Sequence, residues 1–141
     1  MGLFSRKPKH PDLDPSSPVA KQIQEVEVPL KELIQQVSDT LEVVPEDCNA
    51  YVFLGKPPKK FGVAMIEEGE VKSFVSLAKE KGLNQTQILK LNEKFRAAYE
   101  KNMDAERFQA NVAGKDIVVT SCQPLAQDVA HKFSVLAKGK N

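Results

Sequence analysis

Apolar residues recur at helical spacing in four stretches of the sequence, which predicts four amphipathic helices. Their apolar stripes consist, in chain order, of Leu30, Leu33, Ile34, Val37 and Leu41; of Val71, Phe74, Val75 and Ala78; of Ile88, Leu91, Phe95, Ala98 and Tyr99; and of Leu125, Val129, Phe133 and Leu136. Pro29 suits the first position of the first helix, and Pro45 closes that region. Gly82 supplies a left-handed stop to the second helix and Asn84 an N-cap to the third, so we expect a helix hairpin there.

Four other stretches are rich in alternating or β-branched residues, as is typical of strands. Residues 50–54 and 61–66 flank Pro57-Pro58 and predict one hairpin, and residues 107–112 and 117–119 flank Gly114 and predict another. In the second hairpin the alternation places one set of side chains inward and the other outward: Phe108, Ala110 and Val112 against Arg107, Gln109 and Asn111. Residues 25–28 also alternate, and four residues fit either a short strand or an extended lead-in to the first helix.

Together these elements predict an α+β domain over residues 21–141. Its sheet would have about four antiparallel strands in two hairpins, with helices packed on it, in the order α-β-β-α-α-β-β-α. Residues 1–20 contain four of the nine prolines, together with Ser16, Ser17 and several charges, and show no apolar periodicity. Such a segment buries too little apolar surface to offset the entropy of ordering it, so we expect a disordered tail.

Composition narrows the class of protein. A chain of 141 residues, 41% apolar and 28% charged, suits one globular domain. Its 20 basic and 19 acidic residues give a formal charge of +1, so a site for nucleic acid or anionic lipid would have to be a local patch. The sequence contains neither an apolar run near the roughly 18 residues of a membrane span nor a secretory signal, and we expect a cytoplasmic protein with no membrane partner.

Residues 74–93 resemble the helix-turn-helix motif of bacterial repressors. Ala78, Gly82, Leu83, Ile88 and Leu91 occupy the matching places, whereas Lys81 stands where that family usually has an apolar residue. The resemblance implies a DNA-binding regulator that uses residues 74–101. Its groove-facing side chains would be Gln85, Thr86, Gln87 and Lys90, with backbone contacts from Lys79, Lys94 and Arg96.

Charge in that region supports the resemblance. Residues 71–101 contain six Lys and one Arg against three Glu, a local charge of +4. An ordinary helix hairpin needs the same Gly stop, Asn cap and apolar stripes, so that interpretation stays open beside DNA binding.

Two further charged clusters have structural and functional interpretations. Lys56, Lys59 and Lys60 lie in the loop of the first hairpin, where they either protect a sheet edge or contact an anionic partner. Glu67, Glu68 and Glu70 precede the second predicted helix, and we interpret them as partners of its dipole rather than as catalytic acids.

Cys122 is the one candidate nucleophile, because it follows a predicted strand and opens a helix, where backbone N–H groups lower a thiol pKa. A thiol-dependent enzyme at Cys122 is therefore a third hypothesis, beside packing or capping at that position. His131 lies nine residues further on, too far along the helix to touch Cys122. Histidines and acids occur at no spacing typical of a metal site, and the glycines are scattered, so we predict neither a metal nor a cofactor.

The combination favours a non-enzymatic interaction or adaptor module, with a protein partner or a second copy of itself. The order of helix, hairpin, helical insert, hairpin and helix is similar to the roadblock family of adaptor domains, although the fifth strand of that family has no counterpart here. The resemblance implies an adaptor role at the level of topology.

Overall fold

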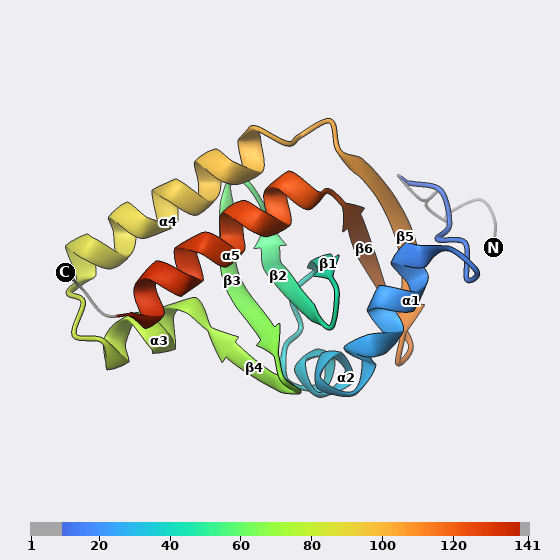
Figure 1. Cartoon of the computed structure of the whole chain (residues 1–141), viewed down its shortest axis with the longest axis horizontal. Helices are drawn as coiled ribbons and strands as arrows, with labels where there is room; N and C mark the ends of the chain where they lie inside the picture. The colour runs from blue at the N-terminus through green and yellow to red at the C-terminus, as the bar shows by residue number, and fades with distance from the viewer. Residues whose placement is uncertain (1–9, 139–141) are drawn as a thin grey trace.

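A six-stranded mixed sheet forms the middle layer of the protein (Figure 1). The computed structural model describes residues 10–138. The strands are β1 (Leu41–Glu46), β2 (Asn49–Lys56), β3 (Lys60–Glu67), β4 (Glu70–Ser73), β5 (Glu106–Val112) and β6 (Lys115–Ser121). They lie in the order β4-β3-β2-β1-β6-β5. The β1–β6 pair is parallel and the other pairs are antiparallel.

Helices cover both faces of this sheet. The helices α1 (Pro18–Glu25) and α2 (Glu27–Gln36) pack on one face, where Leu30 joins Val43 and Val52 in one apolar core. The helices α3 (Phe74–Glu80), α4 (Gln85–Glu100) and α5 (Gln123–Ala137) pack on the other, where Phe95 and Phe133 join a second core. The domain is therefore a three-layer sandwich with a core on each side of the sheet.

Residues 10–20 are part of this fold, where the sequence predicted a disordered tail over residues 1–20. Leu13 donates its N–H to the carbonyl of Gln109 on β5, and Gln109 donates to the carbonyl of Pro11, both at 2.8 Å. Ser17 then caps α1 by accepting a hydrogen bond from the N–H of Ala20. The prolines that suggested disorder instead suit an extended edge segment and the first turn of a helix. Residues 1–9 lie outside the described residues.

The α+β class is confirmed, but the four-stranded antiparallel sheet is wrong because β1 was taken as the end of a helix. The helix of this region ends at Gln36, and Leu41, expected on its stripe, begins β1. Both faces of β1 are covered, so its residues from Leu41 to Pro45 are all buried, Glu42 included, and no alternation marks it as a strand. Pro45 suits this strand because its parallel pairing with β6 extends from Glu42 to Val43 and ends before the proline.

The strand β4 is the second correction. Glu68 and Gly69 have φ of 54° and 78° and make a tight turn between β3 and β4, so the helix expected from Val71 starts at Phe74 instead. Glu67 and Glu70 face each other across this hairpin and are not partners of a helix dipole. Residues 25–28, which were ambiguous, belong to the junction of α1 and α2 and form no strand.

The helix α1 was not predicted, and α2 begins at Glu27, two residues before the expected Pro29. The other elements follow the sequence closely. Both predicted hairpins form, as β2–β3 and β5–β6. Gly82 ends α3 with φ of 82°, and Asn84 opens α4 with a reciprocal capping box to Gln87. The expected stripe of the last helix is buried along α5. Local signals thus determined these elements. Their positions in the sheet depend on β1 and β4, the two strands that were not predicted from the sequence.

Candidate functional site

The helix hairpin α3–α4 presents most of the residues that the DNA-binding hypothesis named. Gln85, Thr86, Gln87, Lys90 and Lys94 are exposed, as is Lys79 at the end of α3. Gln87 is partly committed, because its side-chain oxygen accepts the N–H of Asn84 in the capping box at 2.8 Å. The opposite face of α4 packs on the sheet through Phe95, Ala98 and Tyr99. The structure thus leaves the first turn of α4 open to a partner without showing one.

Arg96 differs from the other named residues, because its guanidinium is used inside the fold. It donates to the carbonyl of Pro58 at 2.5 Å and to the carbonyl of Lys59 at 2.8 Å, and it lies over the ring of Phe61. Arg96 also pairs with Glu93 on its own helix. These contacts fasten the β2–β3 turn to α4, and they hold Lys59 and Lys60 at the surface beside that helix.

A buried carboxylate lies between β1, α4, β5 and β6, and no pattern in the sequence indicated it. Glu42 accepts hydrogen bonds from Tyr99 Oη at 2.6 Å, Arg107 Nε at 2.9 Å and Thr120 Oγ1 at 2.5 Å. Arg107 was expected to face outward, but its side chain is only 9% exposed and forms an ion pair with Glu42. Because side chains alternate along β5, Arg107 lies on the face of the sheet opposite to that of Ala110 and Val112. That face is not exposed to solvent, because α4 packs on it.

The Glu42 cluster is a closed structural network. Arg107 also donates to the carbonyls of Asn102, Met103 and Ala105, so it ties the end of α4 to β5. Burial and the facing Glu42 carboxylate raise the pKa of Tyr99 well above its ordinary value, so its hydroxyl stays protonated as a donor. No buried side-chain nitrogen or oxygen among the described residues lacks a hydrogen-bond partner. The cluster therefore fixes the layers rather than awaiting a substrate.

Cys122 stands at the N-cap position of α5, as the sequence indicated. Its thiol is half-buried, and its Sγ lies 3.4 Å from Oδ1 of Asn102. His131 is exposed on α5, and Cys48 lies in the exposed β1–β2 turn with a φ of 63°. The structure brings no histidine to Cys122, and a thiol-dependent reaction there stays an untested prediction. Within residues 10–138, no group of three His, Cys, Asp or Glu side chains is arranged to hold a metal ion.

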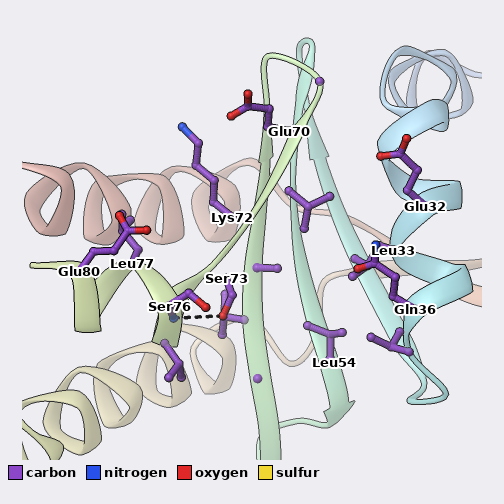
Figure 2. A pocket seen from close by; sticks show the side chains of 17 residues that line it. Glu32, Leu33, Gln36, Leu54, Glu70, Lys72, Ser73, Ser76, Leu77 and Glu80 are labelled. Atoms are coloured by element: carbon purple, nitrogen blue, oxygen red, sulfur yellow. Dashed lines mark hydrogen bonds between the residues drawn. The ribbon is translucent and has the colours of Figure 1, made fainter.

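A broad hollow lies at the β4 edge of the sheet, a region the sequence did not single out. We call it the edge cleft: a hollow of about 920 Å³ whose walls include Leu33 and Gln36 of α2, Gly62 and Ala64 of β3, Val71 of β4 and Leu77 of α3. Figure 2 shows α2 on one side of the cleft and α3 on the other, with β3 and β4 between them. The end of the sheet is therefore left uncovered between its two helical layers.

In this cleft, β3 and β4 have backbone groups that form no hydrogen bonds with another described strand. The four residues of β4 pair with residues 64–67 of β3, so residues 60–63 extend beyond β4. The tight Glu68-Gly69 turn makes Glu67 and Glu70 the closing pair of the hairpin. Because N–H groups alternate in direction along an antiparallel ladder, those of Val71 and Ser73 then point outward from β4, and those of Phe61 and Val63 point outward from β3.

Gly62 forms part of the floor of this cleft and has no conformational reason to be glycine. A Cβ added at Gly62 would meet no atom within 4 Å, and its φ lies outside the left-handed region. Glycine inside a strand weakens the strand, and it often marks a place where another backbone approaches. Gly62 therefore keeps the cleft open at a cost to the stability of β3.

Comparisons with known proteins give no further information on the fold or the site. No protein-family model matches the chain, and neither the curated proteins nor the solved structures searched contain a match. Among the described residues, no helix has the length and apolar character needed to cross a membrane.

Proposed function

We propose that this protein is a non-enzymatic interaction module that binds an extended segment of another protein in the edge cleft. The observation that carries the proposal is the stepped edge of the sheet, where β4 covers only half of β3 and both strands direct backbone groups outward. An extended peptide that joins such an edge gains main-chain hydrogen bonds, while pockets on either side select its side chains. The helices α2 and α3 supply those two sides (Figure 2).

The opposite edge of the sheet supports this proposal by contrast. There, residues 11–13 lie along β5 and exchange two backbone hydrogen bonds with Gln109. The protein thus pairs part of this edge, at Gln109, with its own chain, in the manner we propose for a partner at the other edge. The outward-directed backbone groups at β4 can pair with another chain, which supports a binding function at this edge.

The same edge disfavours pairing between copies of this chain. Only four residues long, β4 contains Glu70 and Lys72, and short charged edge strands are the devices by which proteins avoid edge-to-edge association. We therefore propose a different protein as the partner. The free thiol of the exposed Cys48 is compatible with a reducing compartment, and we propose a cytoplasmic location.

Selection from a library of linear peptides tests this function. We expect binders to be recovered on the wild-type protein and lost on Gly62→Leu, because a Cβ at Gly62 meets no atom within 4 Å and the larger side chain should occupy the space of the peptide. Ala97→Leu, on the exposed surface of α4, is the matched control and should keep the binders. Equal recovery on Gly62→Leu, or no binders at all, contradicts the proposal.

Backbone amides locate the peptide independently. The N–H groups of Val63, Val71 and Ser73 should become protected from hydrogen exchange when a selected peptide binds, because new main-chain hydrogen bonds form there. A peptide that protects only amides of α4 or β5 binds elsewhere and sinks the assignment of the cleft.

DNA binding by α3–α4 is the second candidate function, because Thr86, Lys90 and Lys94 are exposed on one helix of a basic segment. Fluorescence anisotropy with mixed-sequence duplex DNA tests it. Affinity that falls steeply as salt rises, and that weakens with Lys90→Ala or Lys94→Ala, supports this candidate. Lys138→Ala at the end of α5 is the control. An equal loss of DNA affinity in that variant would show that DNA is attracted non-specifically by positive charge anywhere on the surface.

A further inference from the structure

The outer rims of the edge cleft are acidic. Glu32 projects from α2 on one side, Glu80 from α3 on the other, and Glu70 lies at the upper end beside the turn (Figure 2). All three are exposed. Lys72 is the one cation among the lining residues, and its Nζ lies 3.6 Å from a carboxylate oxygen of Glu67. The lining therefore has more negative than positive charge, in a protein whose whole chain is nearly neutral.

Both walls of the cleft combine apolar residues with these carboxylates. The α2 wall includes the buried Leu33 and the half-buried Val37 beside the exposed Glu32 and Gln36. The α3 wall includes the half-buried Leu77 beside the exposed Ser76 and Glu80. The side chains of a strand that joins the edge point alternately to these two walls. Each wall therefore offers apolar surface together with an exposed carboxylate.

Apolar surface next to a carboxylate fits lysine and arginine side chains. Their aliphatic stems pack along apolar surface while the charged group reaches toward an anion or water. An aliphatic residue fits only the apolar part of each wall, and an acidic residue would place its charge against Glu32 or Glu80. From these features, and resting on the proposed function, we infer that the partner is a basic extended segment in which Lys or Arg occupies two neighbouring positions, one facing each wall, flanked by small or apolar residues.

Three fluorescein-labelled peptides test this inference: one in which pairs of adjacent Lys alternate with pairs of Val, so that Lys faces both walls, the same peptide with Gln in place of Lys, and the same with Glu. The Lys peptide should bind most tightly and lose affinity as salt increases, because exposed charge pairs are screened. Removing both rim charges in the double variant Glu32→Gln and Glu80→Gln should weaken the Lys peptide about fivefold, as expected for two exposed ion pairs. The Gln peptide should be unaffected by that variant.

Charge reversal gives the sharper comparison. The double variant Glu32→Lys and Glu80→Lys should invert the order, so that the Glu peptide binds more tightly than the Lys peptide. A matched control, Glu100→Lys with Glu106→Lys, changes the net charge by the same amount at exposed positions of α4 and β5 outside the cleft. If this control inverts the order as well, the preference reflects overall charge and the inference is wrong.

The failures of the two proposals are distinguishable. If all three peptides bind equally, and Gly62→Leu abolishes each, the cleft binds extended segments and only the basic character of the partner is refuted. If no peptide binds and the Val71 and Ser73 amides stay unprotected, the proposed function fails too. A concentration-dependent dimer that protects those amides without peptide identifies a second copy as the occupant and overturns both.

Discussion

At the scale of single residues, the most important feature is the buried ion pair between Glu42 and Arg107. Glu42 and Arg107 are each about nine-tenths buried, and they satisfy one another with help from Tyr99 and Thr120. Such a pair adds little stability over apolar residues, because both charges lose their hydration. Breaking it is costly, since the remaining charge is left without a partner in a poorly hydrated site.

Glu42→Ala should therefore destabilise the protein by about 3 kcal/mol in urea unfolding. Glu106→Ala removes an exposed carboxylate of β5 and should change the free energy of unfolding by less than about 0.5 kcal/mol. Because the two groups share one interaction, the double variant Glu42→Ala and Arg107→Ala should cost clearly less than the two single losses added together. Strict additivity would show that Glu42 and Arg107 act independently.

The two tyrosines give a spectroscopic view of the same buried environment. Burial raises the pKa of both Tyr51 and Tyr99, helped by the nearby carboxylates of Glu46 and Glu42 respectively. Because each folded pKa lies above the unfolded value of about 10, the associated stability is complete below about pH 10 and is lost as the pH rises through the folded pKa. The protein should thus be destabilised by alkali and insensitive to these groups at neutral pH.

Absorbance of tyrosinate near 295 nm checks this expectation, since the chain has only two tyrosines and no tryptophan. The native protein should titrate above pH 10 and the urea-unfolded protein near pH 10. Tyr99→Phe should remove one tyrosinate and flatten part of the alkaline loss of stability. A native tyrosine that titrates at its ordinary pKa would contradict the described burial.

At the scale of secondary-structure elements, α4 depends on a local signal that the sequence displays in full. The side chain of Asn84 accepts the N–H of Gln87 at 2.9 Å, and Gln87 returns the contact to the N–H of Asn84. Asn84→Ala should cost about 1 kcal/mol in thermal or urea unfolding, whereas Asn84→Asp should keep most of the cap. Gln85→Ala, at the next exposed position, is the control and should be nearly neutral.

Other elements of this protein depend on what surrounds them. A Pro such as Pro45, inside residues 41–46, ordinarily argues against a central strand. Here that strand pairs with β2 along its full length, and its pairing with β6 ends before Pro45. The burial of both of its faces, and not the local sequence, determines that β1 is a strand.

At the scale of the whole molecule, the two edges of the sheet should differ in hydrogen exchange. Leu13 and Gln109 donate backbone hydrogen bonds to each other's segments, so their amides should be protected in the free protein. The outward-directed amides of Val71 and Ser73 should exchange rapidly under the same conditions. Met65, an interior position of β3 that faces Lys72, provides an internal reference for a protected strand amide. Equal protection at both edges would mean that the edge cleft is already covered.

The sequence by itself determined the elements whose signals are local. Gly82 and Asn84 defined the helix hairpin, two stretches on either side of Pro57-Pro58 defined β2–β3, and the stripe from Leu125 to Leu136 defined α5. Capping, turns and apolar periodicity act within a few residues, so a single sequence displays them.

Only the tertiary structure decided which of these elements contact one another. It therefore also decided where the candidate site lies. Glu42 and Arg107 are 65 residues apart and become partners because β1 and β6 pair in parallel. The edge cleft likewise combines α2, β3, β4 and α3, and it exists because β4 is shorter than the strand it covers. Contacts between distant segments depend on packing over the whole sheet, and no local pattern of residues records them.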